Sequence, residues 1–131
     1  MEIDKSYRID HRRADVYAAW VSAETVIPPA TAMDVLPQVG GHYRLLMKTA
    51  EFEMSNEGVF LQVVPEDYLH YTWQWSGDDE VSEVEVWFRD EGVSTRIDLR
   101  HSKLTNSESV QNHDVGWDSY VVGLEQFLSV N

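Results

Sequence analysis

Histidine and tyrosine are the side chains of this sequence that could carry out acid–base chemistry. His101 lies on the apolar side of an alternating stretch, whereas His113 and Tyr120 fall on the apolar stripe of a helical pattern. A histidine and a tyrosine within hydrogen-bond reach of a substrate can exchange protons with it. Alternatively, each histidine is a buried residue that donates its N–H group to a backbone carbonyl. Both interpretations stay open from the sequence alone.

Metal and nucleophile chemistry has weaker support. None of the histidines has the i, i+2 or i, i+4 spacing that places two ligands on one metal ion. The chain contains no cysteine, which excludes disulfides, thiolate metal sites and cysteine nucleophiles. No Gly-x-Ser-x-Gly elbow is present, and no phosphate-binding glycine loop follows a strand. We therefore expect neither a metal ion nor a cofactor.

The aromatic residues are more informative. Four of the five tryptophans fall on sides that are predicted to face inward, together with tyrosine and phenylalanine side chains. So many inward rings either fill the space between a sheet and a helix or line a pocket for a planar apolar ligand. The second interpretation predicts the lining residues Trp20, Met33, Leu36, Met47, Tyr71, Trp73, Trp75, Val86, Phe88, Leu99, His113, Gly116, Trp117, Tyr120 and Leu124.

A long helix near the C-terminus must position part of this set. Within Thr105–Val130, spacings of three and four residues define one apolar face, which consists of Val110, His113, Trp117, Tyr120, Val121, Leu124, Phe127 and Leu128. Thr105 and Glu108 fit a capping box at its start. Gly116 and Gly123 each lower helix propensity by about 1 kcal/mol relative to alanine, which favours a close approach of backbone or ligand at these positions.

Most of the preceding chain alternates like β-strands. The alternating stretches are Ile3–Asp10, Tyr43–Lys48, Phe52–Val64, Tyr68–Ser76, Ser82–Arg89 and Val93–His101. Residues 14–21 have helical spacing instead, and a second short turn starts at Ser22 before Pro28 and Pro29 stop it. The stretch Pro29–Val39 has no clear period. It is either a flap over a cavity mouth or an irregular connection.

The order of these elements predicts one α+β domain that comprises residues 1–131. Short turns join the strands, so we expect an antiparallel sheet of about six to seven strands around the long C-terminal helix. One or two short helices follow the first strand. This is a helix-grip arrangement. Trp87 falls on the outer face of the sheet by alternation, where an exposed indole indicates an interface such as that of a homodimer.

The charge of the chain narrows the possible partners. Ten Lys and Arg residues stand against 23 Asp and Glu residues, and the formal net charge is −13. Such a surface repels phosphate backbones and anionic lipid headgroups, so we expect neither a nucleic-acid nor a membrane partner. The N-terminus lacks a signal-peptide pattern. No apolar run approaches the roughly 20 residues that span a bilayer, and a cytoplasmic location is expected.

Several motifs resemble a known family through their order and spacing. They are Arg8-Ile9 with Asp15-Val-Tyr-Ala-Ala-Trp20, Val39-Gly-Gly-His-Tyr-Arg44, Pro65-Glu-Asp-Tyr-Leu-His-Tyr-Thr-Trp73, Ser94-Thr-Arg-Ile-Asp-Leu-Arg-His101 and His113-Asp-Val-Gly-Trp117. This set resembles the START/SRPBCC superfamily, specifically the branch similar to activator of heat-shock protein 90 ATPase homologue 1. The resemblance implies a deep cavity between the sheet and the long helix. Superfamily members bind apolar molecules there, and some are cyclases, dehydratases or hydrolases.

Two departures from the family pattern modify these expectations. Many members carry a tryptophan before the Gly-Gly pair, and here Met33 or Leu36 is expected to take its place. The chain also lacks the separate N-terminal domain of the larger eukaryotic co-chaperones, so a chaperone partner is not expected. We expect a protein that binds a small apolar or aromatic molecule. The alternatives are a cavity enzyme with acid–base chemistry and a co-chaperone-like or homodimeric interaction protein.

Overall fold

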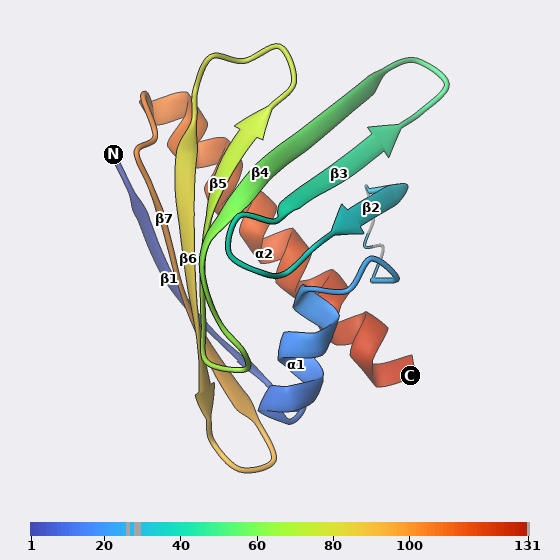
Figure 1. The fold of residues 1–131 in the computed structure, drawn as a ribbon, viewed down its shortest axis with the longest axis vertical. Coiled ribbons are helices and arrows are strands. Elements are labelled where there is room, and N and C mark those ends of the chain that lie inside the picture. Colours follow the sequence, from blue (N-terminus) through green and yellow to red (C-terminus); the bar gives the residue numbers. More distant parts are fainter. Residues whose placement is uncertain (26, 28–29, 131) are drawn as a thin grey trace.

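A computed structural model describes residues 1–25, 27 and 30–130 (Figure 1). Within these residues, the elements follow one another as β1 (Ile3–Ile9), α1 (Arg13–Trp20), β2 (Ala32–Val35), β3 (His42–Lys48), β4 (Glu53–Val64), β5 (Tyr68–Trp75), β6 (Ser82–Asp90), β7 (Thr95–Ser102) and α2 (Ser107–Val130). This order of one strand, a short helix, a run of strands and a long helix agrees with the order predicted from the sequence.

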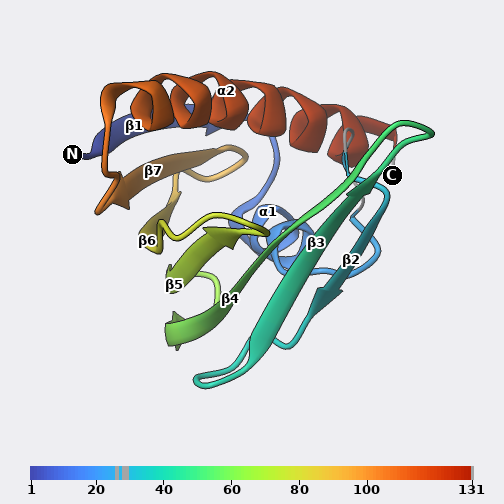
Figure 2. The ribbon, with the colours of Figure 1, turned by 90° about the horizontal axis from the view of Figure 1, so that it is seen from above.

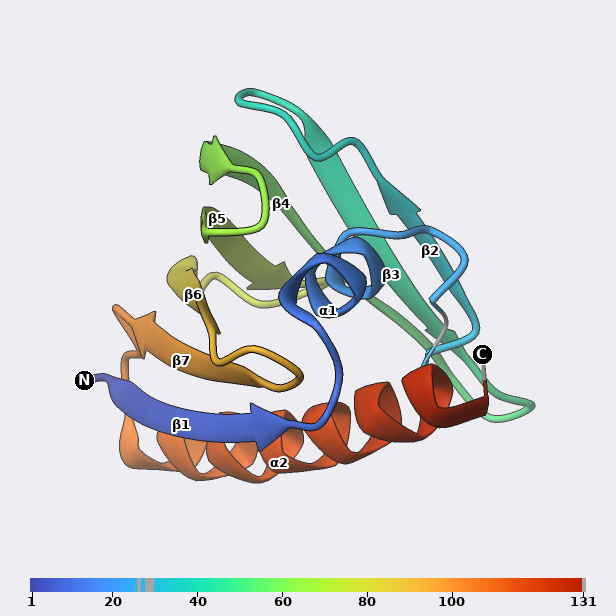
Figure 3. The same cartoon turned by 90° about the horizontal axis from the view of Figure 1, so that it is seen from below.

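The strands form one antiparallel sheet with the order β1-β7-β6-β5-β4-β3-β2. The strand β1 forms one edge of the sheet and pairs along β7, from Ile3 opposite His101 to Ile9 opposite Thr95. The sheet curls around α2, which runs beside β1 across the inner side of the sheet (Figures 2 and 3). The chain therefore has the predicted helix-grip α+β fold.

Alternation determines which side chains of the sheet face α2. On β6, Val84, Val86 and Phe88 are completely buried on the inner face. Trp87 points to the outer face, as predicted, where it is half-buried and its ring centroid lies 5.3 Å from that of Tyr68. The inner face is thus apolar along its central strands, and it requires a covering layer to exclude water.

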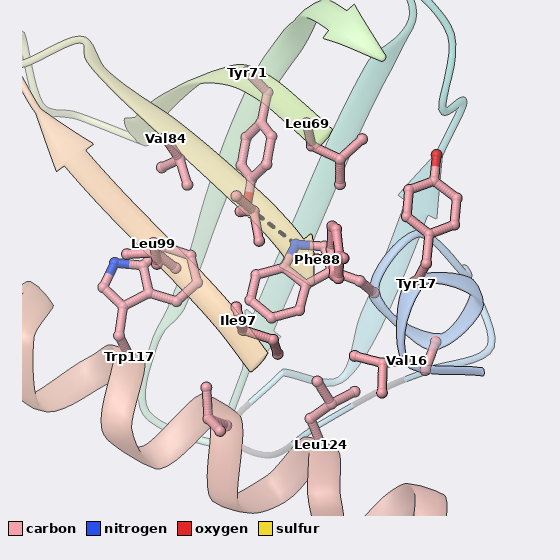
Figure 4. Close-up of a cluster of buried hydrophobic side chains, with 14 of the residues drawn as sticks. Val16, Tyr17, Leu69, Tyr71, Val84, Phe88, Ile97, Leu99, Trp117 and Leu124 are labelled. Atoms are coloured by element: carbon pink, nitrogen blue, oxygen red, sulfur yellow. Dashed lines mark hydrogen bonds between the residues drawn. The ribbon is translucent and has the colours of Figure 1, made fainter. Parts of the chain in front are cut away.

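Apolar side chains fill one part of this layer completely. Phe88, Ile97 and Leu99 of the sheet meet Leu124 of α2 and Val16 of α1 in a cluster with at most 2% of each residue exposed (Figure 4). The Tyr17 and Trp20 rings of α1 approach Phe88 edge-on, at centroid distances of 5.4 and 5.7 Å. We call this cluster the filled region. It anchors both helices to the sheet.

Polar contacts join β1 to the flank of α2. Lys5 Nζ lies 3.0 Å from Asp114 and 2.6 Å from Asp118, and the Tyr7 hydroxyl donates to Asp118 at 2.8 Å. Ion pairs near the surface contribute about 0–1 kcal/mol each. Their main consequence is therefore alignment, because they hold this flank of α2 against β1 while the opposite flank faces β2–β5.

The start of α2 differs from the prediction by one residue. Asn106 is the cap, because its Oδ1 accepts the N–H group of Ser109 at 2.8 Å. Thr105 instead donates its N–H group and its hydroxyl to Glu80, at 2.8 and 2.6 Å. The predicted capping box of Thr105 and Glu108 was therefore wrong, because the loop before β6 supplies a stronger acceptor for Thr105.

The segment without a clear period also differs from the prediction. It contains β2, which pairs with β3 from Ala32 opposite Leu46 to Val35 opposite Tyr43. A strand of four residues is too short to display a period. One short helix follows β1 in the described part of the chain, and the predicted turn at Ser22 is a single hydrogen-bonded turn. Its predicted stop at Pro28 and Pro29 lies outside the described residues.

Candidate functional site

A partly enclosed cavity of about 940 Å³ lies between α2 and the half of the sheet formed by β2–β5. Sites for small molecules commonly have about 300–1,000 Å³, so this space is large enough for a ligand. Its apolar wall consists of Trp20, Ile27, Ala30, Met33, Val35, Tyr43, Leu45, Met47, Met54, Phe60, Tyr71, Trp73, Trp75, Trp117 and Tyr120. We call this part of the molecule the hollow region.

Two glycines of α2 show where the layer is hollow and where it is filled. Apart from its own helix backbone, a Cβ atom at Gly116 would meet no atom of the described residues within 4 Å, and this glycine lines the cavity. A Cβ atom at Gly123, two turns later, would lie 2.4 Å from Ile27 Cγ2. Another segment therefore comes close to α2 at Gly123, through the Ile27 side chain. Gly116 leaves open space beside the helix, and a close approach of a ligand there stays a prediction.

His113 holds two tryptophans at the end of the cavity near the start of α2. The indole N–H groups of Trp73 and Trp75 both donate to His113 Nε2, at 3.2 and 3.1 Å. Because an indole nitrogen can only donate, Nε2 carries no proton. The Nδ1–H group donates to the backbone carbonyl of Ser109 at 2.7 Å. Both imidazole nitrogens are thus occupied, and His113 positions the aromatic wall.

His101 lies inside the sheet–helix layer and does not line the cavity. Its Nδ1 accepts the indole N–H group of Trp117 at 3.1 Å, so its proton is on Nε2 and points to the Ser82 hydroxyl at 2.7 Å. That hydroxyl lies 3.3 Å from the carbonyl oxygen of Trp73. Burial lowers the pKa of His101 to about 3, with a smaller contribution from nearby His113. His101 is therefore a neutral structural link between α2 and the sheet.

Hydroxyl groups lie at the other end of the cavity, where α1 meets α2. The indole of Trp20 donates to the Tyr71 hydroxyl at 3.3 Å (Figure 4). The ring of Tyr120 packs edge-on against Trp20 at a centroid distance of 5.0 Å. Thr25 also lines this wall and is only 2% exposed, yet its hydroxyl has no hydrogen-bond partner among the described residues. We call this part of the cavity, which Tyr71, Tyr120 and Thr25 line, the inner end.

The charged residues of the cavity are acidic and belong to its rim. The rim comprises the β5–β6 turn with Asp78, the following Glu80, and Glu108 on the first turn of α2. Burial opposes ionisation of Glu80, but hydrogen bonds from Thr105 and Ser109 outweigh it and hold the Glu80 pKa below its usual value. No lysine or arginine lines the cavity in the part of the chain that the structure describes. The site therefore attracts neutral or cationic molecules more than anions.

A family match adds to this geometry. The family described as activator of Hsp90 ATPase homolog 1-like protein matches residues 10–129. The chain belongs to this family. No curated protein matches the sequence, so the evidence from relatives is a shared family and a shared fold.

Solved structures of similar proteins support the same fold. An AHSA1-like protein from Aeromonas hydrophila has a TM-score of 0.83 and 18% identity, covering 99% of this chain and 93% of its own. An HSP90 activator from Plasmodium falciparum has a TM-score of 0.82 and 16% identity, covering 98% and 96%. CalU16 from Micromonospora echinospora has a TM-score of 0.73 and 24% identity, covering 98% and 76%. At such identities, the similarity establishes the fold alone.

In this family member, the cavity brings together most of the lining residues that the sequence predicts. The predicted residues that do line it are Trp20, Met33, Met47, Tyr71, Trp73, Trp75, His113, Gly116, Trp117 and Tyr120. Of the three candidates for acid–base chemistry, His113 and Tyr120 line the cavity and His101 does not. Tyr120 is the one whose hydroxyl makes no hydrogen bond with the described residues.

The other predicted lining residues lie elsewhere. Leu36 follows the end of β2 and is 52% exposed, so Met33 is the one of these two expected residues that lines the cavity. The remainder lie in the buried core, at most 2% exposed, and do not line the cavity; they are Val86, Phe88, Leu99 and Leu124. Alternation identified their inward side correctly, but it does not show how close the opposing helix comes.

Sequence reasoning missed part of the cavity wall. Tyr43 and Leu45 line it beside Met47, and their alternation along β3 was a usable signal for that side of the strand. Met54 and Phe60 come from β4, whose pairing with β5 shifts register between Phe60 and Gln62. Both residues precede this bulge and lie at even-numbered positions of β4, so alternation along β4 was a usable signal for them as well. The unpaired hydroxyl of Thr25 had no signal in the sequence pattern.

Two further properties of the described residues bear on the expected partners. Among them, no group of three or more His, Cys, Asp or Glu residues is arranged to hold a metal ion. Neither helix in this part of the chain is long and apolar enough to cross a membrane.

Proposed function

We propose that this protein binds one small apolar, aromatic molecule between α2 and strands β2–β5. The observation that carries the proposal is the cavity of about 940 Å³ with a wall of aromatic, methionine and aliphatic side chains. Empty apolar space of this size loses packing contacts on every side. A planar ligand restores those contacts and removes apolar wall from water, which favours binding.

The arrangement of the wall also favours a binding role. Trp73 and Trp75 are held by His113, and Trp117 is held by His101. Rings that are already fixed lose little conformational freedom when a ligand binds. The same hydrogen bonds occupy both nitrogens of each histidine, so neither is available to take a proton from a substrate. Binding therefore explains the histidines better than acid–base catalysis does.

A neutral fluorescent probe tests the proposal. We expect N-phenyl-1-naphthylamine to bind saturably with one molecule per chain, because its naphthyl and phenyl groups suit the aromatic wall. The Gly116→Leu variant should bind the probe at least about tenfold more weakly than the unmodified protein. The reason is that a leucine side chain takes up open space that lies beside the helix. Fluorescence titration measures both affinities.

A matched variant separates lost space from altered helix chemistry. Val115 is the neighbouring residue on α2, is 65% exposed and does not line the cavity. Val115→Leu should therefore bind the probe as the unmodified protein does. If the probe does not saturate, or if Gly116→Leu binds as tightly as Val115→Leu, the proposed function is refuted.

A further inference from the structure

The inner end of the cavity offers hydrogen-bond donors for which the described residues provide no acceptor. The Tyr71 hydroxyl accepts the indole proton of Trp20 at 3.3 Å, and no described residue accepts its own proton. The Tyr120 hydroxyl makes no hydrogen bond within the described part of the chain. Both residues line the cavity, and both pack around the Trp20 ring. Their hydroxyl groups therefore converge on the same end of the apolar space.

A third hydroxyl group of the cavity also lacks a hydrogen-bond partner among the described residues. The Thr25 hydroxyl is buried without a partner among the described residues, although its side chain lines the cavity. A buried polar group that lacks a hydrogen bond costs about 1–3 kcal/mol. Native structures tolerate such groups mainly where a ligand or an ordered water completes them. Unpaired hydroxyls around one cavity thus indicate a ligand with a polar end.

We propose that the ligand is a neutral aromatic compound whose buried end carries a hydrogen-bond acceptor, such as a carbonyl oxygen, bound by the hydroxyls of Tyr120 and Tyr71. This inference rests on the proposed function and specifies the class of ligand. The Tyr71 hydroxyl already accepts one hydrogen bond from Trp20, which leaves it best suited to donate. A ligand that only donates would leave both phenolic protons unpaired.

The electrostatics of the cavity favour a neutral acceptor over an anionic one. Burial raises the pKa of Tyr71 and of Tyr120, so both stay protonated donors at neutral pH. The charged lining residues Asp78, Glu80 and Glu108 are carboxylates, and no lysine or arginine lines the described cavity to balance a buried anion. An unpaired buried carboxylate would be strongly disfavoured in such an apolar site. A carbonyl needs no counter-ion.

The position of the donors also orients the ligand. Along β5, Trp75 lies beside the rim and Tyr71 lies four residues deeper. Along α2, the first turn belongs to the rim, while Tyr120 lies more than three turns further on. The acceptor therefore enters first, and the aromatic body of the ligand remains between Trp73, Trp75 and Trp117.

A pair of probes with nearly the same shape tests this inference. In 2-acetylnaphthalene the ring carries a carbonyl oxygen, which a methylene group replaces in 2-isopropenylnaphthalene. Equilibrium dialysis measures the dissociation constant of each compound for the unmodified protein and for Tyr120→Phe. We expect the variant to bind the ketone about fivefold to tenfold more weakly, which corresponds to one lost hydrogen bond, and to bind the alkene unchanged.

Further variants keep the test specific. Tyr71→Phe should also weaken ketone binding selectively, although it additionally leaves the Trp20 indole unpaired. Tyr68→Phe is the matched control, because the Tyr68 hydroxyl donates to Glu85 on the outer face of the sheet. Its affinity for both compounds should equal that of the unmodified protein. The anion 2-naphthoate should bind to the unmodified protein at least about tenfold more weakly than the ketone, because no positive charge in the cavity balances its carboxylate.

The outcomes distinguish this inference from the proposed function. If Tyr120→Phe weakens both naphthalene compounds equally, or neither, the acceptor inference is overturned while an apolar binding site remains. Tighter binding of 2-naphthoate than of the ketone also overturns it. If neither compound binds to the unmodified protein, the inference fails. If N-phenyl-1-naphthylamine then also fails to bind, the proposed function fails with it.

Discussion

The filled and hollow regions are built from the same sheet and the same helix, yet they differ in packing. In the filled region, Phe88, Ile97 and Leu99 meet Leu124 with almost no exposed surface. In the hollow region, Leu45, Met47 and Met54 line open space and remain partly accessible. In the first region α1 covers the inner face of the sheet, whereas in the second the cavity separates α2 from β2–β5.

Polar atoms reveal the same contrast. In the filled region, the buried Thr95 hydroxyl donates to the backbone carbonyl of His11 at 2.8 Å. In the hollow region, the buried Thr25 hydroxyl has no partner among the described residues. A region that only stabilises the fold satisfies its polar groups internally. A binding site of the kind we propose keeps such groups unpaired until the ligand binds, and it therefore contributes less to the stability of the empty protein.

The largest expected effect is the difference in unfolding free energy that is lost when a leucine of each region is truncated to alanine. Leu99→Ala should lower the free energy of unfolding by about 2–5 kcal/mol, because it leaves a cavity in a packed cluster. Leu45→Ala should lower it by less than about 1.5 kcal/mol, because Leu45 already borders open space and loses fewer contacts. Urea unfolding of both variants gives the two values. Equal losses would show that the two regions are packed alike.

The free energy of unfolding should depend on pH through His101, which links α2 to the sheet. Its pKa is about 3 in the folded protein and about 6.5 in an unfolded chain. Because the folded-state pKa is lowered, the neutral imidazole stabilises the fold fully above about pH 6.5, and this stabilisation is lost as the pH falls toward 3. Between pH 7 and pH 5, we expect a loss of about 2 kcal/mol from this residue.

Urea unfolding at both pH values measures that loss, and His101→Gln identifies its source. The variant should be less stable at pH 7, because Trp117 and Ser82 lose their partner. Its stability should nevertheless fall less between pH 7 and pH 5, by about 2 kcal/mol relative to the unmodified protein. An identical pH dependence in the two proteins would mean that His101 does not titrate on unfolding.

The sequence predicted the fold because the fold depends on local patterns. Alternation placed Val84, Val86 and Phe88 on the inner face, and helical spacing placed Trp117 and Leu124 on the inner face of α2. Burial confirms each of these positions. Such patterns report which side of an element is apolar. They depend little on distant residues, so one sequence was sufficient.

The boundary of the cavity was predictable only in part. Val86 and Tyr71 show the same alternation, but the first is covered by the filled region and the second lines the cavity. The curl of the sheet and the position of α1 decide between these outcomes, and both depend on contacts between distant segments. The Ser82 partner of His101 and the tryptophan partners of His113 are equally non-local. Sequence periodicity contains no information about such distances.

The two glycines of α2 provide a smaller test of the same contrast. Gly116→Ala should raise the free energy of unfolding by about 1 kcal/mol, because alanine favours helix and its methyl group enters open space. Gly123→Ala should raise the free energy of unfolding by less than Gly116→Ala does, or lower it, because its methyl group would clash with the Ile27 side chain. Thermal or urea unfolding of the two variants shows the difference. An equal gain at both positions would contradict the assignment of Gly123 to a packed contact.

The smallest expected effect concerns two buried threonines, one in each region. Thr95→Val should lower the free energy of unfolding by about 1 kcal/mol, because it breaks a satisfied hydrogen bond and leaves the His11 carbonyl without it. Thr25→Val should leave the empty protein unchanged or stabilise it by up to about 1 kcal/mol, because it removes a hydroxyl that has no partner among the described residues. Urea unfolding without added ligand compares them directly. A loss at Thr25 as large as that at Thr95 would mean that the empty protein already satisfies the hydroxyl, and the hollow region would then not be held ready for a ligand at this position.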